Sequence, residues 1–373
     1  MSLFFFLVFL LYTLINFYIF RRGRTALTSV RKTYFIYCLL FFIFYSAFVI
    51  AMLGRNYLPL GLQKVLYFIG TCWMGVLFYI TLYFLITDCL YVLNRFFRFL
   101  PRKITPLLFR RIQVVSGYLI VIIALTVGYI RFNHPVVVEK DITIHKPGGH
   151  YKELKAVVVS DLHLGVQVDK KKLQKYVQLI NSQQPDIILI AGDIVDNNVL
   201  PLNEERMYEE FNQLNAPLGV YFCMGNHEYL SGIEASRKFL EKTNITLLVD
   251  TAIQVNHSFW IIGRNDQQGG FRKPLHELVA QTDTLQALIL LDHEPYFLDD
   301  AVNRGIDLQI SGHTHDGQLW PLNLMVEKMF ELAHGYKQKG KTHFYVSSGL
   351  ALWGPPFRIG TQSELVVLHI HLE

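Results

Sequence analysis

Metal-binding side chains recur in the second half of the chain, each group directly after a short apolar run. The groups are Ser160-Asp161-Leu162-His163, Gly192-Asp193, Gly225-Asn226-His227-Glu228, Asp292-His293 and Gly312-His313-Thr314-His315. Carboxylates are hard oxygen ligands, and imidazoles suit Zn, Fe and Mn. Two ions held roughly 3.5–4 Å apart acidify a bridging water and stabilise an in-line displacement at phosphorus. These residue types therefore indicate a two-metal site for phosphate-ester hydrolysis.

Each group alone is weak evidence for such a site. Asp-x-His and Gly-Asp pairs occur by chance in many proteins, and a single histidine such as His293 is more often a surface or core residue. His313 and His315 also fit two outward-facing residues of an edge strand. The ordered occurrence of all five groups favours a site, because ligands of α/β sheets gather at the carboxyl ends of strands.

The elements that must position these groups follow an α/β pattern, in which β-rich runs alternate with amphipathic helical stretches. We expect strands at 155–160, 186–191, 219–224, 259–263, 285–291, 308–311, 342–348 and 364–371. We expect helices at 170–182, 204–214, 233–242 and 294–303. Glycines precede Asp193, Asn226 and His313, where they permit tight turns that direct the next side chain into the site.

The first third of the chain is a membrane region by composition, and the whole chain has a mean hydropathy of +0.27. A spanning helix needs about 20 apolar residues. Four uncharged stretches approach or exceed that length: Leu3–Phe20, Thr33–Leu53, Val65–Thr87 and Ile112–Ile130. Arg21 and Arg22 follow the first stretch where a signal peptide would have a cleavage site, so we interpret it as a retained span. We therefore predict a four-span anchor over residues 1–131 and a catalytic domain over residues 132–373.

Charge is distributed unevenly along the chain. Residues 1–130 contain 13 Lys/Arg and one acid, Asp88, whereas residues 131–373 contain 22 Lys/Arg and 29 Asp/Glu. The first and third loops are rich in basic residues, but the second has only Arg55 and Lys64. Basic loops favour the cytoplasm, so we predict the catalytic domain on the non-cytoplasmic side of the cell or inner membrane. The acidic soluble part offers no electrostatic support for nucleic-acid binding.

Other polar residues of the membrane region indicate little chemistry. Asp88 ends the third span beside a basic loop, which favours an interfacial carboxylate over a proton relay. The spans carry no further charge, and this argues against a transporter. The four cysteines lack the spacing of a metal knuckle or redox pair, so we interpret them as small buried hydrophobic residues.

The ordered motif set resembles the calcineurin-like metallophosphoesterase family. The motifs span residues 161–315, and the family fold, an αββα sandwich of two sheets, would cover residues 135–373. The strings Leu-Asp-His-Glu-Pro at 291–295 and Gly-His-Thr-His-Asp-Gly-Gln at 312–318 are similar to a bacterial branch with membrane-associated phosphodiesterases and a UDP-2,3-diacylglucosamine pyrophosphatase. In that branch a glycine often stands at the position of Asp316.

The resemblance implies two divalent transition-metal ions (Mn, Fe or Zn) and a role for each ligand. One ion would be held by Asp161, His163, Asp193 and His315. The other would be held by Asp193, Asn226, His293 and His313, with Asp193 bridging. His227 would hydrogen-bond the phosphate and protonate the leaving oxygen. Arg358 could contact a phosphate or form a structural salt bridge, and Asn197 could face the cleft or lie in a solvated loop.

The expected activity is hydrolysis of a phosphodiester or pyrophosphate bond by metal-activated water at a membrane surface. A phosphomonoesterase with the same metal core and a non-catalytic, metal-binding regulatory membrane protein are the alternatives. The segment 319–332 has apolar residues at helical spacing from Met325 onward. Such a helix either lies at the lipid interface, which would favour a lipid-linked substrate, or packs over the edge of a sheet.

Overall fold

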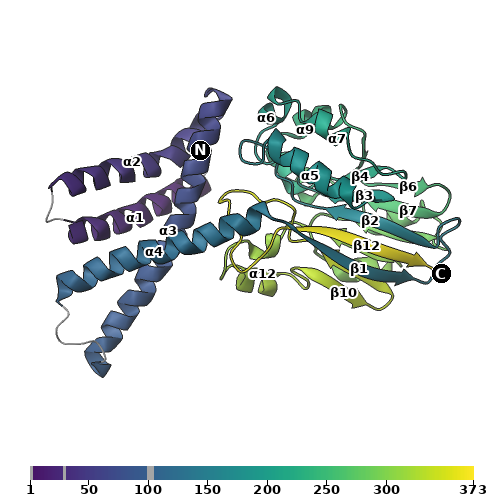
Figure 1. The fold of residues 1–373 in the computed structure, drawn as a ribbon. Coiled ribbons are helices and arrows are strands. Elements are labelled where there is room, and N and C mark those ends of the chain that lie inside the picture. The colour runs from purple at the N-terminus through teal and green to yellow at the C-terminus, as the bar shows by residue number, and fades with distance from the viewer. Residues whose placement is uncertain (1–2, 28–30, 99–104) are drawn as a thin grey trace. The chain divides into compact units, whose positions relative to one another are not determined.

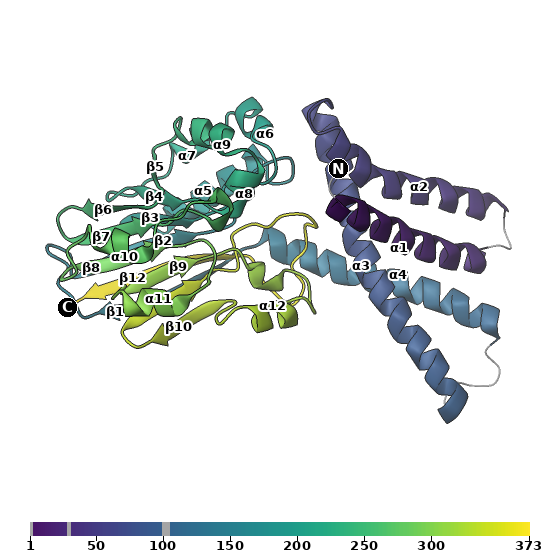
Figure 2. The same ribbon diagram turned by 180° about the vertical axis from the view of Figure 1, so that it is seen from behind.

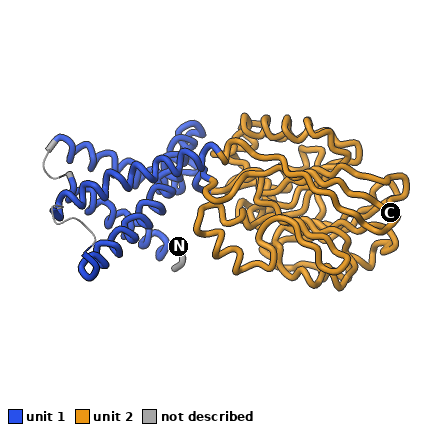
Figure 3. Tube along the Cα trace, turned by 60° about the horizontal axis from the view of Figure 1, so that its bottom comes forward, with its two compact units in different colours: residues 1–130, 354–357 blue, residues 131–353, 358–373 orange. Residues whose placement is uncertain are grey.

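The computed structural model describes residues 3–27, 31–98 and 105–373. The chain separates into two compact units, coloured in Figure 3. The first comprises residues 1–130 with Gly354–Phe357, and the second comprises residues 131–353 with 358–373.

The first unit is helical. Among the described residues, four helices are long and apolar enough to cross a membrane (Figure 1): α1 (Leu3–Leu27), α2 (Arg31–Leu53), α3 (Leu60–Phe97) and α4 (Pro106–Asn133). Each contains one of the predicted spans and extends beyond it. The amide side chain of Asn16 within α1 is paired, because it accepts a 2.9 Å hydrogen bond from the Trp73 indole. This bond removes the cost of an unpaired amide in lipid.

The second unit contains two six-stranded sheets in the described part of the chain. The first has the order β1 (Val136–Ile144), β12 (Glu364–Leu372), β2 (Glu153–Val159), β3 (Ile187–Ala191), β4 (Val220–Cys223) and β5 (Ile245–Leu248). The second has the order β10 (Gly335–Lys339), β11 (Thr342–Val346), β9 (Leu308–Ser311), β8 (Ala287–Leu291), β7 (Phe259–Gly263) and β6 (Thr251–Val255). Strands β2 to β5 are mutually parallel, as are β7, β8, β9 and β11.

Alternating residues of the central strands enter different cores, which explains the continuous apolar runs. In β2, Ala156 and Val158 lie in the core between the sheets, whereas Val157 and Val159 face the core beneath α5 (Lys170–Ser182). The helices α10 (Leu275–Val279) and α11 (Leu298–Asn303) pack on the outer face of the second sheet. Figure 1 shows α5 on the outside of the first sheet, and Figure 2 shows α10 and α11 on the outside of the second, which is the expected αββα sandwich.

Several elements differ in extent from the prediction. The helix expected at 204–214 is instead two short helices, α6 (Leu200–Glu204) and α7 (Tyr208–Phe211), because Arg206 adopts a left-handed φ of 52° between them. The helix expected at 294–303 starts only at Leu298, and the strands at 342–348 and 285–291 are shorter than expected. The unpredicted strands β1, β5, β6 and β10 are short or lie at sheet edges, where a continuous apolar run is not required.

The pairing of β1 fixes where the membrane helix joins the second unit. Val136 is paired with Glu364, and Val366 is paired with Val158 near the carboxyl end of β2. The beginning of β1 therefore lies at the same edge of the sheet as the residues that follow β2. Only His134 and Pro135 separate α4 from β1.

Candidate metal centre

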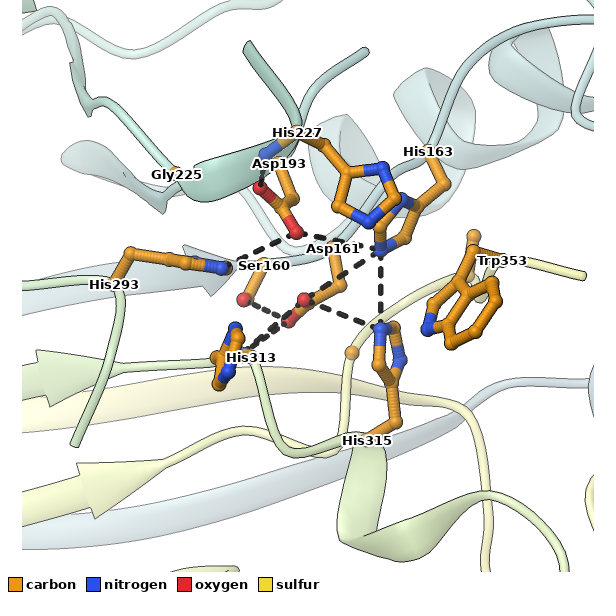
Figure 4. A network of polar contacts seen from close by, with 12 residues as sticks. Ser160, Asp161, His163, Asp193, Gly225, His227, His293, His313, His315 and Trp353 are labelled. Carbon is orange, nitrogen blue, oxygen red and sulfur yellow. Dashed lines mark hydrogen bonds and ion pairs between the residues drawn. The ribbon is translucent and has the colours of Figure 1, made fainter. Parts of the chain in front are cut away.

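The predicted metal-binding residues lie together at the carboxyl edge of both sheets. Asp161 and His163 follow β2, Asp193 follows β3, and Asn226 follows β4 at the start of α8 (Asn226–Leu230). From the second sheet, His293 follows β8, and His313 and His315 follow β9. Figure 4 shows the labelled aspartate and histidine side chains of this set pointing toward a common centre.

The backbone reverses sharply at these positions. Asp161, His163, Asp193, His313 and His315 all have φ between 43° and 71°, in the left-handed region. This conformation costs a residue with a Cβ atom about 1–2 kcal/mol. Hydrogen bonds hold it in place, including Asp161 N to Gly192 O (3.2 Å) and His163 N to Asp193 O (3.0 Å). Strain at several adjoining positions is typical of a functional site.

The three glycines that precede ligands serve two different purposes. Gly192 has a φ of 84°, as a tight turn requires. Gly225 and Gly312 do not have positive φ, so no left-handed conformation requires a glycine at these two positions. They are needed for space instead: a Cβ on Gly225 would collide with Asp193, and a Cβ on Gly312 would collide with Ser160 and Asp161.

One group of ligand atoms surrounds a point between β2 and β9. The Nε2 atoms of His163 and His315 are 3.1 Å apart, and they lie 3.7 Å and 3.5 Å from Asp161 Oδ1. Donors that bind one ion at about 2.1 Å in tetrahedral geometry are about 3.4 Å from one another. The Nδ1 atoms of both rings are buried and have no hydrogen-bond partner among the described residues. These spacings fit a metal ion.

A second group adjoins the first. Asp193 Oδ2 lies 3.2 Å from His293 Nε2, which lies 3.2 Å from Asn226 Oδ1. His313 Nδ1 is 3.0 Å from the same amide oxygen. The ring of His293 is oriented by a 2.7 Å hydrogen bond from Nδ1 to the Ala191 carbonyl, which leaves Nε2 free to bind metal.

Asp193 belongs to both groups. Its Oδ2 atom is 3.6 Å from His163 Nε2 in the first group and 3.2 Å from His293 Nε2 in the second. Its other oxygen, Oδ1, accepts a 2.9 Å hydrogen bond from the backbone N–H of His227. This bond fixes the orientation of the carboxylate between the two groups.

The two carboxyls and two of the imidazoles have shifts that suit metal binding. Burial opposes ionisation of Asp161 and Asp193, but neighbouring histidines outweigh it and hold the pKa of both carboxyls below the ordinary value. Burial, with repulsion from His293, lowers the pKa of His313 to about 4, and burial lowers the pKa of His315 well below its usual value. Ionised carboxylates and neutral imidazoles are the forms that ligate cations. Burial opposes protonation of His163 and His293, but the neighbouring aspartates outweigh it and raise the pKa of both rings.

Two buried carboxylates support the centre and were not singled out by the sequence argument. Glu228 accepts hydrogen bonds from the backbone N–H groups of Asp193 (3.1 Å), Val195 (3.0 Å) and Gly225 (2.8 Å). Burial and the Asp193 charge raise the pKa of Glu228 to about 7. It therefore ties the turn after β3 to the turn after β4.

The second supporting carboxylate is Asp196. Its Oδ1 atom lies 3.6 Å from His227 Nδ1 and 3.7 Å from His163 Nδ1, and its backbone carbonyl accepts a 2.7 Å hydrogen bond from His227 Nδ1. Asp196 thus orients His227, and burial raises the pKa of its own carboxyl. The signal in the sequence was its position three residues after Asp193.

The two candidate substrate contacts have other partners. Arg358 is 0% exposed, and its guanidinium donates to the carbonyls of His315 (2.7 Å), Ser348 (2.6 Å) and Ala351 (2.7 Å). These bonds hold the loops around the site, and no salt bridge to Arg358 is present among the described residues. Asn197 is half-buried and donates a 2.7 Å hydrogen bond to the Asp196 carboxylate.

The departure at Asp316 does not alter the local backbone type. Asp316 has a φ of 51°, in the left-handed region that a glycine adopts at lowest cost. Aspartate is one of the residues that tolerate this region. The turn after His315 is therefore retained with a side chain present.

Sequence comparison with known proteins finds related phosphoesterases. A family profile described as calcineurin-like phosphoesterase matches residues 154–317. The chain is 33% identical to a metallophosphoesterase of Aquifex aeolicus, over 58% of this chain and 85% of that protein. It is 28% identical to a metallophosphoesterase of Campylobacter jejuni, over 99% of this chain and 98% of that protein.

The name of a vertebrate relative includes both a transmembrane region and a metallophosphoesterase domain. The chain is 31% identical to a protein of Danio rerio named transmembrane protein with metallophosphoesterase domain, over 68% of this chain and 61% of that protein. With its apolar helices, two-sheet sandwich and clustered ligands, the chain belongs to the calcineurin-like metallophosphoesterase family.

Proposed function

We propose that this protein is a membrane-anchored, two-metal phosphoesterase that hydrolyses a phosphodiester or pyrophosphate bond. The position of Asp193 Oδ2 carries the proposal, because it lies within 3.6 Å of a ligand atom in each of the two groups. One carboxylate oxygen so placed can bridge two ions. The ligands are oxygen and imidazole nitrogen without thiolates, a set that suits Mn, Fe or Zn.

The chain supplies the metal ligands and a proton donor. Asp161, His163, Asp193 and His315 would hold one ion, and Asp193, Asn226, His293 and His313 the other. Bound ions would polarise the phosphoryl group and acidify the attacking water. Because the Asp196 carbonyl accepts from His227 Nδ1, the Nε2 atom is the one that would donate a proton to the leaving oxygen, with the ring in the imidazolium form.

A lipid-linked substrate is the finer part of the proposal. It rests first on the junction between α4 and β1, which lies at the sheet edge that carries the metal centre. Two residues separate these elements, so the chain there spans at most about 10 Å. The start of β1 thus lies at the catalytic edge of the domain. The resemblance to the UDP-2,3-diacylglucosamine pyrophosphatase branch points to the same class of substrate.

The helix α12 (Asn323–Met329) supplies the second support. Trp320, Leu324, Met325 and Met329, on and just before this helix, are 49%, 48%, 60% and 64% exposed. The ring of Phe330, directly after α12, lies 6.2 Å from that of His313. An exposed apolar surface beside the ligands is the feature that an amphiphilic substrate would contact.

The test uses the purified full-length chain loaded with Mn²⁺. We expect hydrolysis of a generic phosphodiester and a lipid-linked pyrophosphate, and slower hydrolysis of a phosphomonoester. Asp193→Asn should reduce turnover by at least about 100-fold, since even outer ligand partners contribute 10–100-fold. Asp299→Asn, at an exposed carboxylate, is the matched control.

Elemental analysis accompanies the assay. We expect about two metal ions per wild-type chain and fewer in Asp193→Asn. Full activity with less than one ion per chain would contradict the two-metal proposal. Faster cleavage of the monoester would support the phosphomonoesterase, and metal binding without hydrolysis of any substrate would support a regulatory protein.

A further inference from the structure

A cavity of about 520 Å³ lies among α1, α3 and α4 of the helical unit. Its polar lining includes Arg21, Arg22, Asp88, Arg110 and Gln113. Arg21 and Arg22 directly follow the apolar segment of α1, and Arg110 lies two residues before that of α4. The cavity is therefore at the level where the apolar segments end, which is the headgroup region of a bilayer.

Only one of the three arginines is neutralised within the unit. Arg22 pairs with Asp88, with a 2.9 Å bond from Nη1 to Oδ1, and donates a 3.0 Å bond to Gln113. Gln113 also donates to Asp88 at 3.1 Å. Asp88 is the single acidic residue in residues 1–130, so the unit contains no second carboxylate for Arg21 or Arg110. The lining thus has a net charge of +2.

The remaining wall is apolar and aromatic. Phe17 and Tyr91 contribute from α1 and α3, and Phe109 and Val114 contribute from α4. Two unneutralised guanidiniums suit a phosphate, which they can bind in bidentate geometry. A soluble phosphate has no apolar surface that could contact this wall. A phospholipid presents a phosphate and an apolar glycerol–acyl region together. Basic pockets between membrane helices bind anionic headgroups in this way.

We propose that this cavity binds the headgroup of an anionic phospholipid. Arg21 and Arg110 contact the phosphate, and Asp88 with Gln113 fixes Arg22 beside them. Asp88 then has a structural part in the lipid site. The proposal is independent of the metal centre, so its outcome does not depend on the catalytic activity.

The experiment measures lipid retention by native mass spectrometry of the full chain, released from bilayers of equal phosphatidylglycerol and phosphatidylcholine. We expect wild-type protein to retain phosphatidylglycerol preferentially. Arg21→Gln with Arg110→Gln should weaken that retention about 30-fold, the value expected from two interfacial arginines. Arg95→Gln with Arg98→Gln removes the same charge from the end of α3 outside the cavity, and should leave retention unchanged.

A second variant, Val114→Trp, fills the cavity while it keeps all three arginines. It should also lose phosphatidylglycerol, and it keeps the test valid if the double arginine variant does not fold. Equal retention of the two lipids, equal loss in the Arg95/Arg98 control, or full retention in Val114→Trp would each overturn the proposal. Displacement of the lipid by millimolar inorganic phosphate would overturn it too, because the site would then bind a free anion.

Discussion

At the scale of single residues, the site separates metal ligands from groups that orient them. His227 lies among the predicted ligands, and its ring is close enough to Asp193 and His163 for it to be taken for a ligand from proximity alone. Its backbone N–H, however, bonds Asp193 Oδ1 at 2.9 Å, and its Nδ1 is occupied by a carbonyl. These bonds leave Nε2 free, as the corresponding bond does in His293, so proton donation by His227 stays a prediction.

His227→Ala should therefore lower kcat with little change in metal content. General acid–base groups contribute about 10²–10⁴-fold, and the loss should shrink for substrates whose leaving groups need no proton. Steady-state kinetics with a series of leaving groups and elemental analysis measure both effects. His276→Ala, at an exposed histidine of α10, is the control. Loss of an ion in His227→Ala would show that this residue is a ligand.

At the scale of elements, the segment around α12 contains both a packed apolar residue and exposed apolar residues. The segment was expected either to face lipid or to pack over a sheet edge. Phe330 does pack, since it is 8% exposed and its ring stacks on Tyr296 with centroids 4.9 Å apart. Met325 and Met329, one helical turn apart, are exposed instead. The apolar pattern of the sequence therefore combines a core residue with a free face.

Met325→Ser with Met329→Ser should slow cleavage of a lipid-linked pyrophosphate and spare a soluble phosphodiester. The reason is that the change removes apolar surface without opening the core. Leu230→Ser with Leu285→Ser, at exposed leucines away from α12, is the matched control. Equal losses on both substrates would contradict a lipid-contacting role for α12.

Phe330→Ser separates the packing role from that role. Removal of a buried phenylalanine side chain costs about 3–5 kcal/mol, so the melting temperature should fall for this variant and not for the methionine pair. Thermal unfolding of the purified variants measures the difference.

At the scale of the whole molecule, the charge pattern and the fold place different constraints on the protein. The excess of basic residues in the first and third loops predicts the side of the membrane, although Arg102 and Lys103 of the third loop lie outside the described residues. The pairing of β1 fixes which edge of the domain follows the last helix. The charge pattern constrains how the chain inserts into the membrane, and the strand pairing constrains how the second unit folds.

A reporter fused after Glu373 should be active outside the cytoplasm. The motive is the asymmetry of the basic loops, which sets orientation during insertion. Parallel fusions to alkaline phosphatase, active outside, and to a fluorescent protein that folds in the cytoplasm measure the side. An N-terminal fusion should report the same side if all four helices span. Activity of the C-terminal fusion in the cytoplasm alone would contradict the predicted orientation.

The sequence alone predicted the ligand types, their order and the membrane helices, because these depend on local composition. The four apolar helices are confirmed, and the ligand roles stay predictions. Asp161, Asp193 and His293 follow strands that are buried on both faces, and such strands are continuous apolar runs. Helices that span lipid are visible for the same reason. The edge strand β1 has three consecutive charged residues, Glu139, Lys140 and Asp141, and the turn at Arg206 depends on a left-handed φ, so neither has a clear local signal.

Only the tertiary structure decided which residues meet across the chain. Arg358 had the chemistry of a phosphate ligand, but folding surrounds it with carbonyls of two loops. Asp196 had the chemistry of a solvated carboxylate, but folding places it against His227 and His163. Both outcomes depend on contacts distant in sequence, whose geometry is set by the packing of two sheets. The order of residue types along the chain predicts which side chains can bind metal. The packing of the two sheets decides which residues contact one another.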